Sequence, residues 1–142
     1  TGDDVMKRLL GPRLRLFTVA AQAETATAPE HIEGATNLSA EQVIDLILNQ
    51  PKLVIIDARK QEEFAKGHIE NAVSLLDTAM SESALAQSVP TKETPVLFYC
   101  NGKRCMRSTN SANKALSWGY SKVYWFRGGW GEWREKQLPV SK

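Results

Sequence analysis

Residues 96–108 read VLFYCNGKRCMRS, and the order of patterns within this stretch indicates the fold class of the chain. Its first four residues are apolar and end at Cys100, a pattern typical of a strand that is buried on both faces. A short polar loop follows, and the residues from Ser108 to Trp118 have the pattern of a helix. A strand that leads through such a loop into a helix predicts an α/β layer architecture.

The loop after Cys100 is cationic, because Lys103, Arg104 and Arg107 follow the cysteine closely. Positive side chains, free backbone N–H groups and a helix dipole all favour an anion at this place. A free cysteine has a pKa of about 8.5, and such surroundings lower it to roughly 3.5–7.5. We therefore predict that Cys100 is a thiolate nucleophile at neutral pH. The competing interpretation is a buried structural thiol, since free cysteine is among the most buried residue types.

The overall composition is that of an ordinary globular domain. The chain has 142 residues, of which 42% are hydrophobic and 24% are charged, and this length suits one domain with a core of its own. A formal net charge of +2 gives no indication of nucleic-acid or anionic-membrane binding. No run approaches the roughly 18 apolar residues that a membrane span needs. Two cysteines in one short loop cannot cross-link distant parts of a fold. They do not indicate whether the protein lies in the bacterial cytoplasm or in the periplasm.

The N-terminal quarter of the chain differs from the rest. Residues 1–23 have a weak likeness to a signal peptide, but Pro12 and nearby arginines interrupt the apolar run. We interpret this stretch as the tail of an upstream segment or as an additional helix. Residues 20–35 are mostly small and polar, which is typical of a linker. We therefore expect an extension and linker over residues 1–36 and one domain over residues 37–142, with a further domain upstream in a longer protein.

Beyond residue 37 the chain alternates between helical and strand patterns. The predicted elements are a helix capped by Ser39 and stopped by Pro51, a strand over Leu53–Ile56, a helix over Gln61–Lys66, a strand over Ala72–Leu76, a helix over Ser81–Gln87, a strand over Val96–Tyr99, a helix over Ser108–Trp118, a strand over Val123–Phe126 and a final segment over Trp130–Lys136. This order predicts a central, mainly parallel sheet with helices on both faces. Ligands bind beyond the carboxyl ends of such strands, so Asp57 and Cys100 should share one edge.

Two further segments resemble the signatures of a known family. Residues 55–73 read IIDARKQEEFAKGHIENAV, with Asp-x-Arg, Glu-Phe and Gly-His-Ile in order, and Glu70-Asn71 stand where Pro-Gly is usual. Residues 119–140 contain Gly-Tyr, Gly-Gly-Trp and Leu-Pro-Val. Together with the cysteine at a strand end, these segments resemble the single-domain rhodaneses, a sulfurtransferase family, over residues 37–140. The resemblance implies a rhodanese-like α/β fold.

The resemblance also implies a mechanism. Cys100 would attack the outer sulfur of a small anionic donor such as thiosulfate and become a persulfide. It would then pass that sulfur to a thiophilic acceptor, which is cyanide, a thiol or a protein. Backbone N–H groups of the loop would form a nest for the terminal sulfur or the leaving anion. The predicted substrate-binding loop consists of Asn101, Gly102, Lys103, Arg104, Cys105, Met106 and Arg107.

Two charged residues at the neighbouring strand end are expected to support the loop. We predict that Arg107 folds back to pair with Asp57, since a charge at the sheet edge needs a partner. Arg59 is expected to close the edge or to bind a neighbouring carboxylate. Nothing in the sequence indicates a cofactor or a metal, because Cys100 and Cys105 lack the further ligands that zinc requires.

The active loop departs from the common family pattern. Common rhodaneses have four residues between the cysteine and the loop arginine, whereas six separate Cys100 from Arg107. This chain resembles a subgroup in which a longer loop carries a second cysteine, and a longer loop implies a wider anion pocket. Cys105 either resolves a persulfide or sulfenic acid on Cys100 by forming a disulfide, or fills space near the start of the helix. Spacing alone does not decide between these roles.

Two other function classes could also use a reactive cysteine in this loop. A regulatory module would sense sulfide or oxidants through Cys100 and Cys105 without turnover. A phosphatase of the same fold would need an arginine where Met106 stands, and Tyr99 replaces the histidine of tyrosine phosphatases, so phosphatase chemistry is disfavoured and arsenate reduction stays open.

We expect His68 to have a structural role in its turn. The aromatic residues near the C-terminus should pack a helical layer rather than stack on bases.

Overall fold

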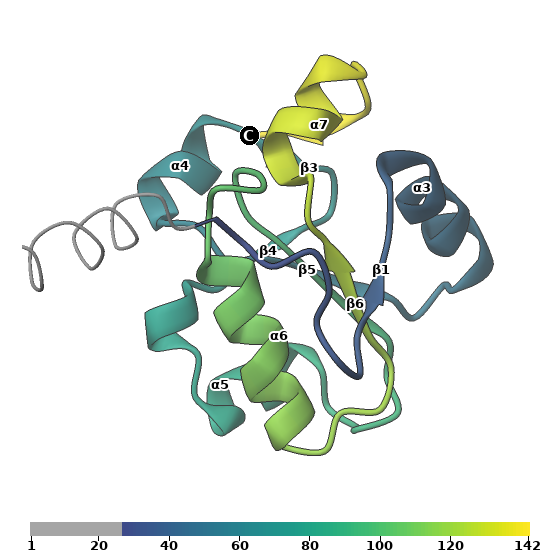
Figure 1. The fold of residues 1–142 in the computed structure, drawn as a ribbon, viewed down its shortest axis with the longest axis vertical. Helices are drawn as coiled ribbons and strands as arrows, with labels where there is room; N and C mark the ends of the chain where they lie inside the picture. The colour runs from purple at the N-terminus through teal and green to yellow at the C-terminus, as the bar shows by residue number, and fades with distance from the viewer. Residues whose placement is uncertain (1–26) are drawn as a thin grey trace, which may run out of the picture.

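The computed structural model describes residues 27–142 (Figure 1), so the predictions made for residues 1–23 lie outside the described range. The described elements are, in chain order, β1 (Thr36–Asn37), α3 (Ala40–Asn49), β2 (Val54–Asp57), α4 (Gln61–Lys66), β3 (His68–Ile69), β4 (Val73–Ser74), the 3₁₀ helix η1 (Asp77–Ala79), α5 (Glu82–Ser88), β5 (Val96–Tyr99), α6 (Arg107–Ser117), β6 (Val123–Phe126), α7 (Gly129–Glu135) and β7 (Val140–Ser141). In this part of the chain, none of the helices combines the length and the apolar character needed to cross a membrane.

A five-stranded parallel sheet forms the centre of the domain, with the strand order β1-β6-β5-β2-β4. Strands β2 and β5 are neighbours, and their register places Asp57 beside Tyr99. Strands β3 and β7 form a separate antiparallel pair. The predicted parallel sheet is therefore confirmed, and the strand ends that carry Asp57 and Cys100 lie at the same edge.

Both faces of the sheet are buried, because successive side chains of a strand point to opposite faces. Ile56 and Phe98 belong to one core cluster together with residues of α5 and α6. Their neighbours Ile55 and Leu97 belong to the other cluster, together with residues of α3 and α7. Figure 1 shows these helices on the two sides of the sheet. This arrangement explains why the strands read as continuous apolar runs rather than alternating ones.

The predicted helix boundaries hold closely. The Ser39 side chain accepts a hydrogen bond from the Gln42 N–H, and the Gln42 side-chain oxygen accepts one from the Ser39 N–H, so the predicted capping box is present. Helix α6 begins at Arg107, one residue before the predicted start. Gly119 follows this helix with a φ of 93°, which is the left-handed conformation typical of a glycine after a helix end.

Residues 27–35 were expected to belong to a linker, but in the structure they pack against the domain. Ala28 and Ile32 are 3% and 6% exposed and lie in the core cluster on the α6 side of the sheet. The Arg127 guanidinium donates hydrogen bonds to the Ala28 carbonyl at 2.9 Å and to the Pro29 carbonyl at 2.7 Å. The linker interpretation was therefore wrong for these residues, because two buried apolar side chains suffice to anchor a polar segment.

We predict that Ile32→Ala destabilises the domain by about 2–4 kcal/mol, because it removes buried methyl groups and leaves a cavity in the core. The matched control is Leu48→Ala in α3, whose side chain is 75% exposed, and which should change the free energy of unfolding by no more than about 0.5 kcal/mol. Urea unfolding at equilibrium measures both values. Equal effects of the two substitutions would contradict the burial of Ile32.

Candidate functional site

Cys100 lies directly after the end of β5 and is 1% exposed. Its carbonyl accepts a hydrogen bond from the Trp130 N–H at 2.8 Å, and the Asn101 carbonyl accepts one from the Gly131 N–H at 2.9 Å. Gly129 has a φ of 58°, and a Cβ at that position would collide with the Cys100 carbonyl oxygen. Glycine is therefore needed at the first position of α7, because the backbone there lies against the backbone of the cysteine loop.

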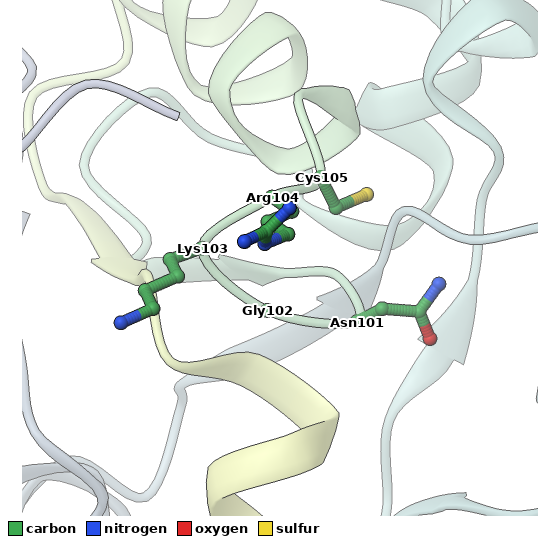
Figure 2. Close-up of a pocket in the computed structure, with 5 residues that line it drawn as sticks. All are labelled: Asn101, Gly102, Lys103, Arg104 and Cys105. Carbon is green, nitrogen blue, oxygen red and sulfur yellow. The ribbon is translucent and has the colours of Figure 1, made fainter. Parts of the chain in front are cut away.

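The loop after Cys100 turns back on itself and surrounds a pocket of about 440 Å³ lined by residues 101–105, as Figure 2 shows. The Cys105 N–H donates to the Gly102 carbonyl at 3.0 Å and closes the turn. No backbone carbonyl of residues 27–142 accepts a hydrogen bond from the N–H groups of Gly102, Lys103 or Arg104. The side chains of Lys103 and Arg104 are exposed. The loop thus offers N–H donors and positive charge in one place.

A buried ion pair supports the strand ends on which the loop is built. Asp57 is fully buried, and Arg59, which is 2% exposed, contacts it through Nε and through Nη2, the latter at 2.7 Å. The Tyr99 hydroxyl donates to Asp57 Oδ2 at 2.7 Å and accepts from the Ile69 N–H at 3.1 Å. Burial, followed by the charge of Asp57, raises the pKa of Tyr99 far above its usual value. Burial alone would lower the pKa of Arg59, but bonding to Asp57 outweighs it and the net pKa is raised.

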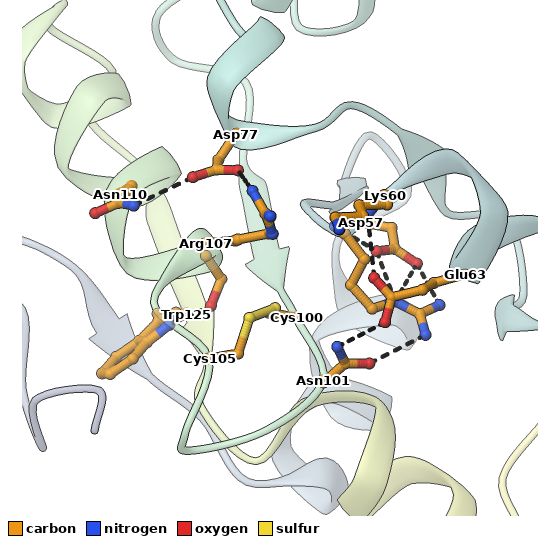
Figure 3. The surroundings of a disulfide bond; sticks show 12 residues. Asp57, Lys60, Glu63, Asp77, Cys100, Asn101, Cys105, Arg107, Asn110 and Trp125 are labelled. Carbon is orange, nitrogen blue, oxygen red and sulfur yellow. Dashed lines mark hydrogen bonds and ion pairs between the residues drawn. A yellow bond between two sulfur atoms is a disulfide. The ribbon is translucent and has the colours of Figure 1, made fainter. Parts of the chain in front are cut away.

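The ion pair of Asp57 and Arg59 is also connected to Asn101, the residue after Cys100. Arg59 Nη1 donates to Asn101 Oδ1 at 3.4 Å, and Asn101 Nδ2 donates to Glu63 Oε2 at 2.9 Å. Figure 3 shows Asn101 directed toward Glu63. The hydrogen bond from Asn101 lowers the pKa of Glu63 below its usual value despite partial burial. Both residues that flank Cys100 are therefore tied to Asp57, directly through Tyr99 and indirectly through Arg59.

The predicted pairing of Arg107 with Asp57 is wrong. Arg107 Nη1 lies 2.6 Å from Asp77 Oδ1, and Asn110 Nδ2 donates to the other oxygen of Asp77 at 3.1 Å (Figure 3). Asp77 is 4% exposed, so it needs these donors. The physical reason is that Arg59 already satisfies Asp57 from within the same strand end. Arg107 instead ties the start of α6 to the 3₁₀ helix η1.

Cys100 and Cys105 form a disulfide in this structure, with their Cα atoms 6.2 Å apart. Figure 3 shows the bond bridging the two limbs of the loop. Cys105 is half-buried and lines the pocket of residues 101–105, whereas Cys100 is almost fully buried. The two cysteines are thus close enough to react with each other, as one of the two roles considered for Cys105 requires.

A second pocket of about 350 Å³ lies next to the loop and shares Asn101 with it. Trp130 lines this pocket, and the guanidinium carbons of Arg59 and Arg134 lie 4.9 and 5.5 Å from centroids of the Trp130 ring system.

His68 has the structural role expected of it: its Nδ1 lies 2.8 Å from the Phe64 carbonyl, and its ring stacks on Phe64 with a centroid separation of 3.6 Å.

Several residues of the site were not singled out by the sequence. The sequence pattern placed Tyr99 in a buried strand, and the identity of this residue argued against a phosphatase, but neither predicted that the Tyr99 hydroxyl is a partner of Asp57. Glu63 and Asp77 were also missed, although each binds a residue of the loop or of the helix that follows it. The presence of Glu63 in the first signature segment was the only available signal, because hydrophobic patterns do not reveal which polar groups meet in space.

Fold and site together define an α/β domain with a cysteine loop at the carboxyl edge of a parallel sheet. A family model of the rhodanese-like domain matches residues 39–136, which is well over half of the chain. The chain therefore belongs to the rhodanese-like domain family.

Individual proteins resemble the chain to different extents. The rhodanese domain-containing protein CG4456 of Drosophila melanogaster is 31% identical over 109 residues, which cover 68% of this chain and 95% of that protein. The uncharacterized protein YibN of Escherichia coli is 26% identical over 95 residues, covering 66% of this chain and 64% of YibN, so the chain spans less than two thirds of it. The thiosulfate sulfurtransferase of Pseudomonas aeruginosa has a TM-score of 0.65 at 23% identity, covering 75% of this chain and 20% of that one. This last likeness shows the fold alone.

We predict that Tyr99→Phe destabilises the domain by about 1–3 kcal/mol at neutral pH, because it leaves the Ile69 N–H without an acceptor and removes a donor from Asp57. Because the pKa of Tyr99 is raised in the folded state, its stabilising effect is fully present below the ordinary tyrosine pKa of about 10 and is lost as the pH rises further. The difference between wild type and variant should therefore shrink above about pH 10.

Urea unfolding at neutral and alkaline pH measures this difference. The control is Tyr124→Phe, because the Tyr124 hydroxyl has no hydrogen bond to any residue from 27 to 142. A pH-independent difference for Tyr99→Phe would show that the hydroxyl does not bind the buried carboxylate.

Proposed function

We propose that the chain is a sulfurtransferase or sulfane-sulfur carrier with Cys100 as its nucleophile. In the reduced protein, the Cys100 thiolate attacks the outer sulfur of thiosulfate and forms a new S–S bond. The original S–S bond breaks, its electron pair leaves with sulfite, and Cys100 becomes a persulfide. A thiophilic acceptor, which is cyanide, a thiol or a protein thiol, then takes the terminal sulfur and releases the Cys100 thiolate.

One observation carries this proposal: Cys100 begins a loop whose backbone N–H groups at Gly102, Lys103 and Arg104 have no backbone acceptor within residues 27–142. A persulfide or a leaving sulfite needs donors that are held in place before the charge develops. The hydrogen bonds from α7 to the carbonyls of Cys100 and Asn101 hold the start of the loop. These donors, on a loop whose start is held by α7, support the proposed stabilisation of an anion.

The donor is proposed to be a small anion because of the charge around the pocket. Lys103 and Arg104 are exposed beside it, and exposed cations raise the rate at which anions arrive. Arg107 is not assigned to the donor, since its guanidinium contacts Asp77. Asp57 and Arg59 are proposed to act as positioning residues through Tyr99 and Asn101.

A second candidate function is a redox or sulfide-sensing module that is modified without turnover. The observation that favours it is the disulfide between Cys100 and Cys105. The two candidates differ in turnover: a sulfurtransferase forms many equivalents of thiocyanate from thiosulfate and cyanide, whereas a sensor forms at most one.

We predict that brief thiosulfate treatment of the reduced protein, freed of reductant, adds one sulfur atom to its intact mass, and that cyanide removes that atom. Cys100→Ser should abolish the gain because it removes the nucleophile, whereas Cys105→Ser should retain it. Intact-mass spectrometry measures all three proteins under the same conditions. A gain in Cys100→Ser, or a gain that cyanide does not remove, would exclude a persulfide on Cys100.

We predict that Lys103→Ala combined with Arg104→Ala lowers the rate constant for loading from thiosulfate about tenfold at low ionic strength, and less at high ionic strength, because screening weakens the attraction. Lys52→Ala is the control, since Lys52 is exposed at the opposite end of the sheet, before β2. The initial rate of sulfur gain measures the effect. If the control slows loading as much as the double variant, local attraction is not the cause.

A further inference from the structure

The two cysteines are held near each other by contacts other than their own bond. The first limb of the loop is fixed by the hydrogen bonds of α7 to the Cys100 and Asn101 carbonyls, at 2.8 and 2.9 Å. The second limb runs into α6, which Arg107 ties to Asp77. The Cα separation of Cys100 and Cys105, 6.2 Å, lies in the ordinary range for a disulfide. The Cys105 thiol of the reduced protein therefore stays a neighbour of Cys100.

The surroundings of Cys105 argue against a filling role. Its side chain is half-buried and lines the open pocket of residues 101–105 (Figure 2). It belongs to neither of the two core clusters, which contain the buried apolar residues of the domain. A residue that filled space near the helix start would instead be enclosed by the core.

Resting on the proposed function, we propose that Cys105 discharges the Cys100 persulfide as hydrosulfide. The Cys105 thiolate attacks the Sγ of Cys100 and forms the disulfide bond seen in the structure. The S–S bond of the persulfide breaks, and its electron pair leaves with the terminal sulfur as hydrosulfide. The sulfane sulfur is reduced, the two cysteine sulfurs are oxidised, and no external oxidant takes part. The chain thereby gains a second activity, the release of sulfide, besides transfer to an acceptor.

A dithiol reductant completes the cycle. Cys105 is the more exposed residue of the pair, so an incoming thiolate attacks its sulfur, forms a mixed disulfide there and releases the Cys100 thiolate. The second thiol of the reductant then frees Cys105. Over one cycle, thiosulfate and a dithiol give sulfite, hydrogen sulfide and a cyclic disulfide, so that sulfur, hydrogen and charge all balance.

The test is a single-turnover experiment on the full 142-residue chain. The protein is reduced, freed of reductant and loaded with one sulfur atom from thiosulfate. A parallel sample is loaded from inorganic polysulfide. After removal of the donor and without any added thiol, the wild type should release one equivalent of hydrosulfide, and its mass should become that of the intramolecular disulfide. In Cys105→Ser and Cys105→Ala the persulfide should persist, with hydrosulfide release at least about a hundredfold slower, because the neighbouring thiol is absent. Leu48→Ala in α3, whose side chain is 75% exposed, should release hydrosulfide at the wild-type rate.

The outcomes separate this proposal from the proposed function. A wild-type persulfide that loads and then persists would overturn the discharge step while leaving sulfur transfer intact. Hydrosulfide release from Cys105→Ser at the wild-type rate would also overturn it. If thiosulfate does not load Cys100 but polysulfide does, the proposed donor is wrong and the polysulfide sample still tests the discharge. If neither donor loads Cys100, both proposals fail.

Discussion

The buried ion pair of Asp57 and Arg59 is the interaction on which the cysteine site depends. A fully buried carboxylate without partners costs several kcal/mol, and removal of either member of such a pair costs about 3–5 kcal/mol. Asp57 accepts hydrogen bonds from Arg59 and from the Tyr99 hydroxyl, while Arg59 also donates to Asn101. Because Tyr99 precedes Cys100 and Asn101 follows it, the pair positions Cys100 from both sides. The main contribution of the ion pair is this placement of the neighbouring residues, since replacing a buried ion pair by apolar side chains is often neutral for stability.

The sheet and its functional edge could be predicted because their determinants are local in the sequence. Each strand is a short apolar run, and the carboxyl ends of parallel strands meet at one edge, so Asp57 and Cys100 had to lie close together. The partner of Arg107 could not be predicted in the same way. Arg59, only two residues away in the sequence, already provides Asp57 with hydrogen bonds. Asp77 lies in a short 3₁₀ helix after β4, and such a short segment has no hydrophobic periodicity from which its burial could be predicted.

The segment before β1 shows a different reason for a failed prediction. Its composition is small and polar, and composition averages over a segment, so a few anchoring side chains leave no trace in it. Ala28 and Ile32 supply the buried surface, and the Ala28 N–H donates to the Lys103 carbonyl at 2.7 Å. That hydrogen bond joins the N-terminal segment to the cysteine loop. The segment therefore contributes to the shape of the site as well as to the core.

The longer loop explains how the proposed sulfur transfer and the disulfide can share one site. A cysteine at the start of a loop meets a second one only if the chain reverses between them, and the turn from Gly102 to Cys105 provides that reversal. Contacts to α7 and to Asp77 hold the two limbs, so the neighbouring positions of the two sulfurs do not require the disulfide itself. Under the proposed discharge, the two extra residues relative to the common loop change the chemistry available to a persulfide on Cys100. The thiol of Cys105 would then compete with every external acceptor, and an acceptor would have to take the sulfur before Cys105 does.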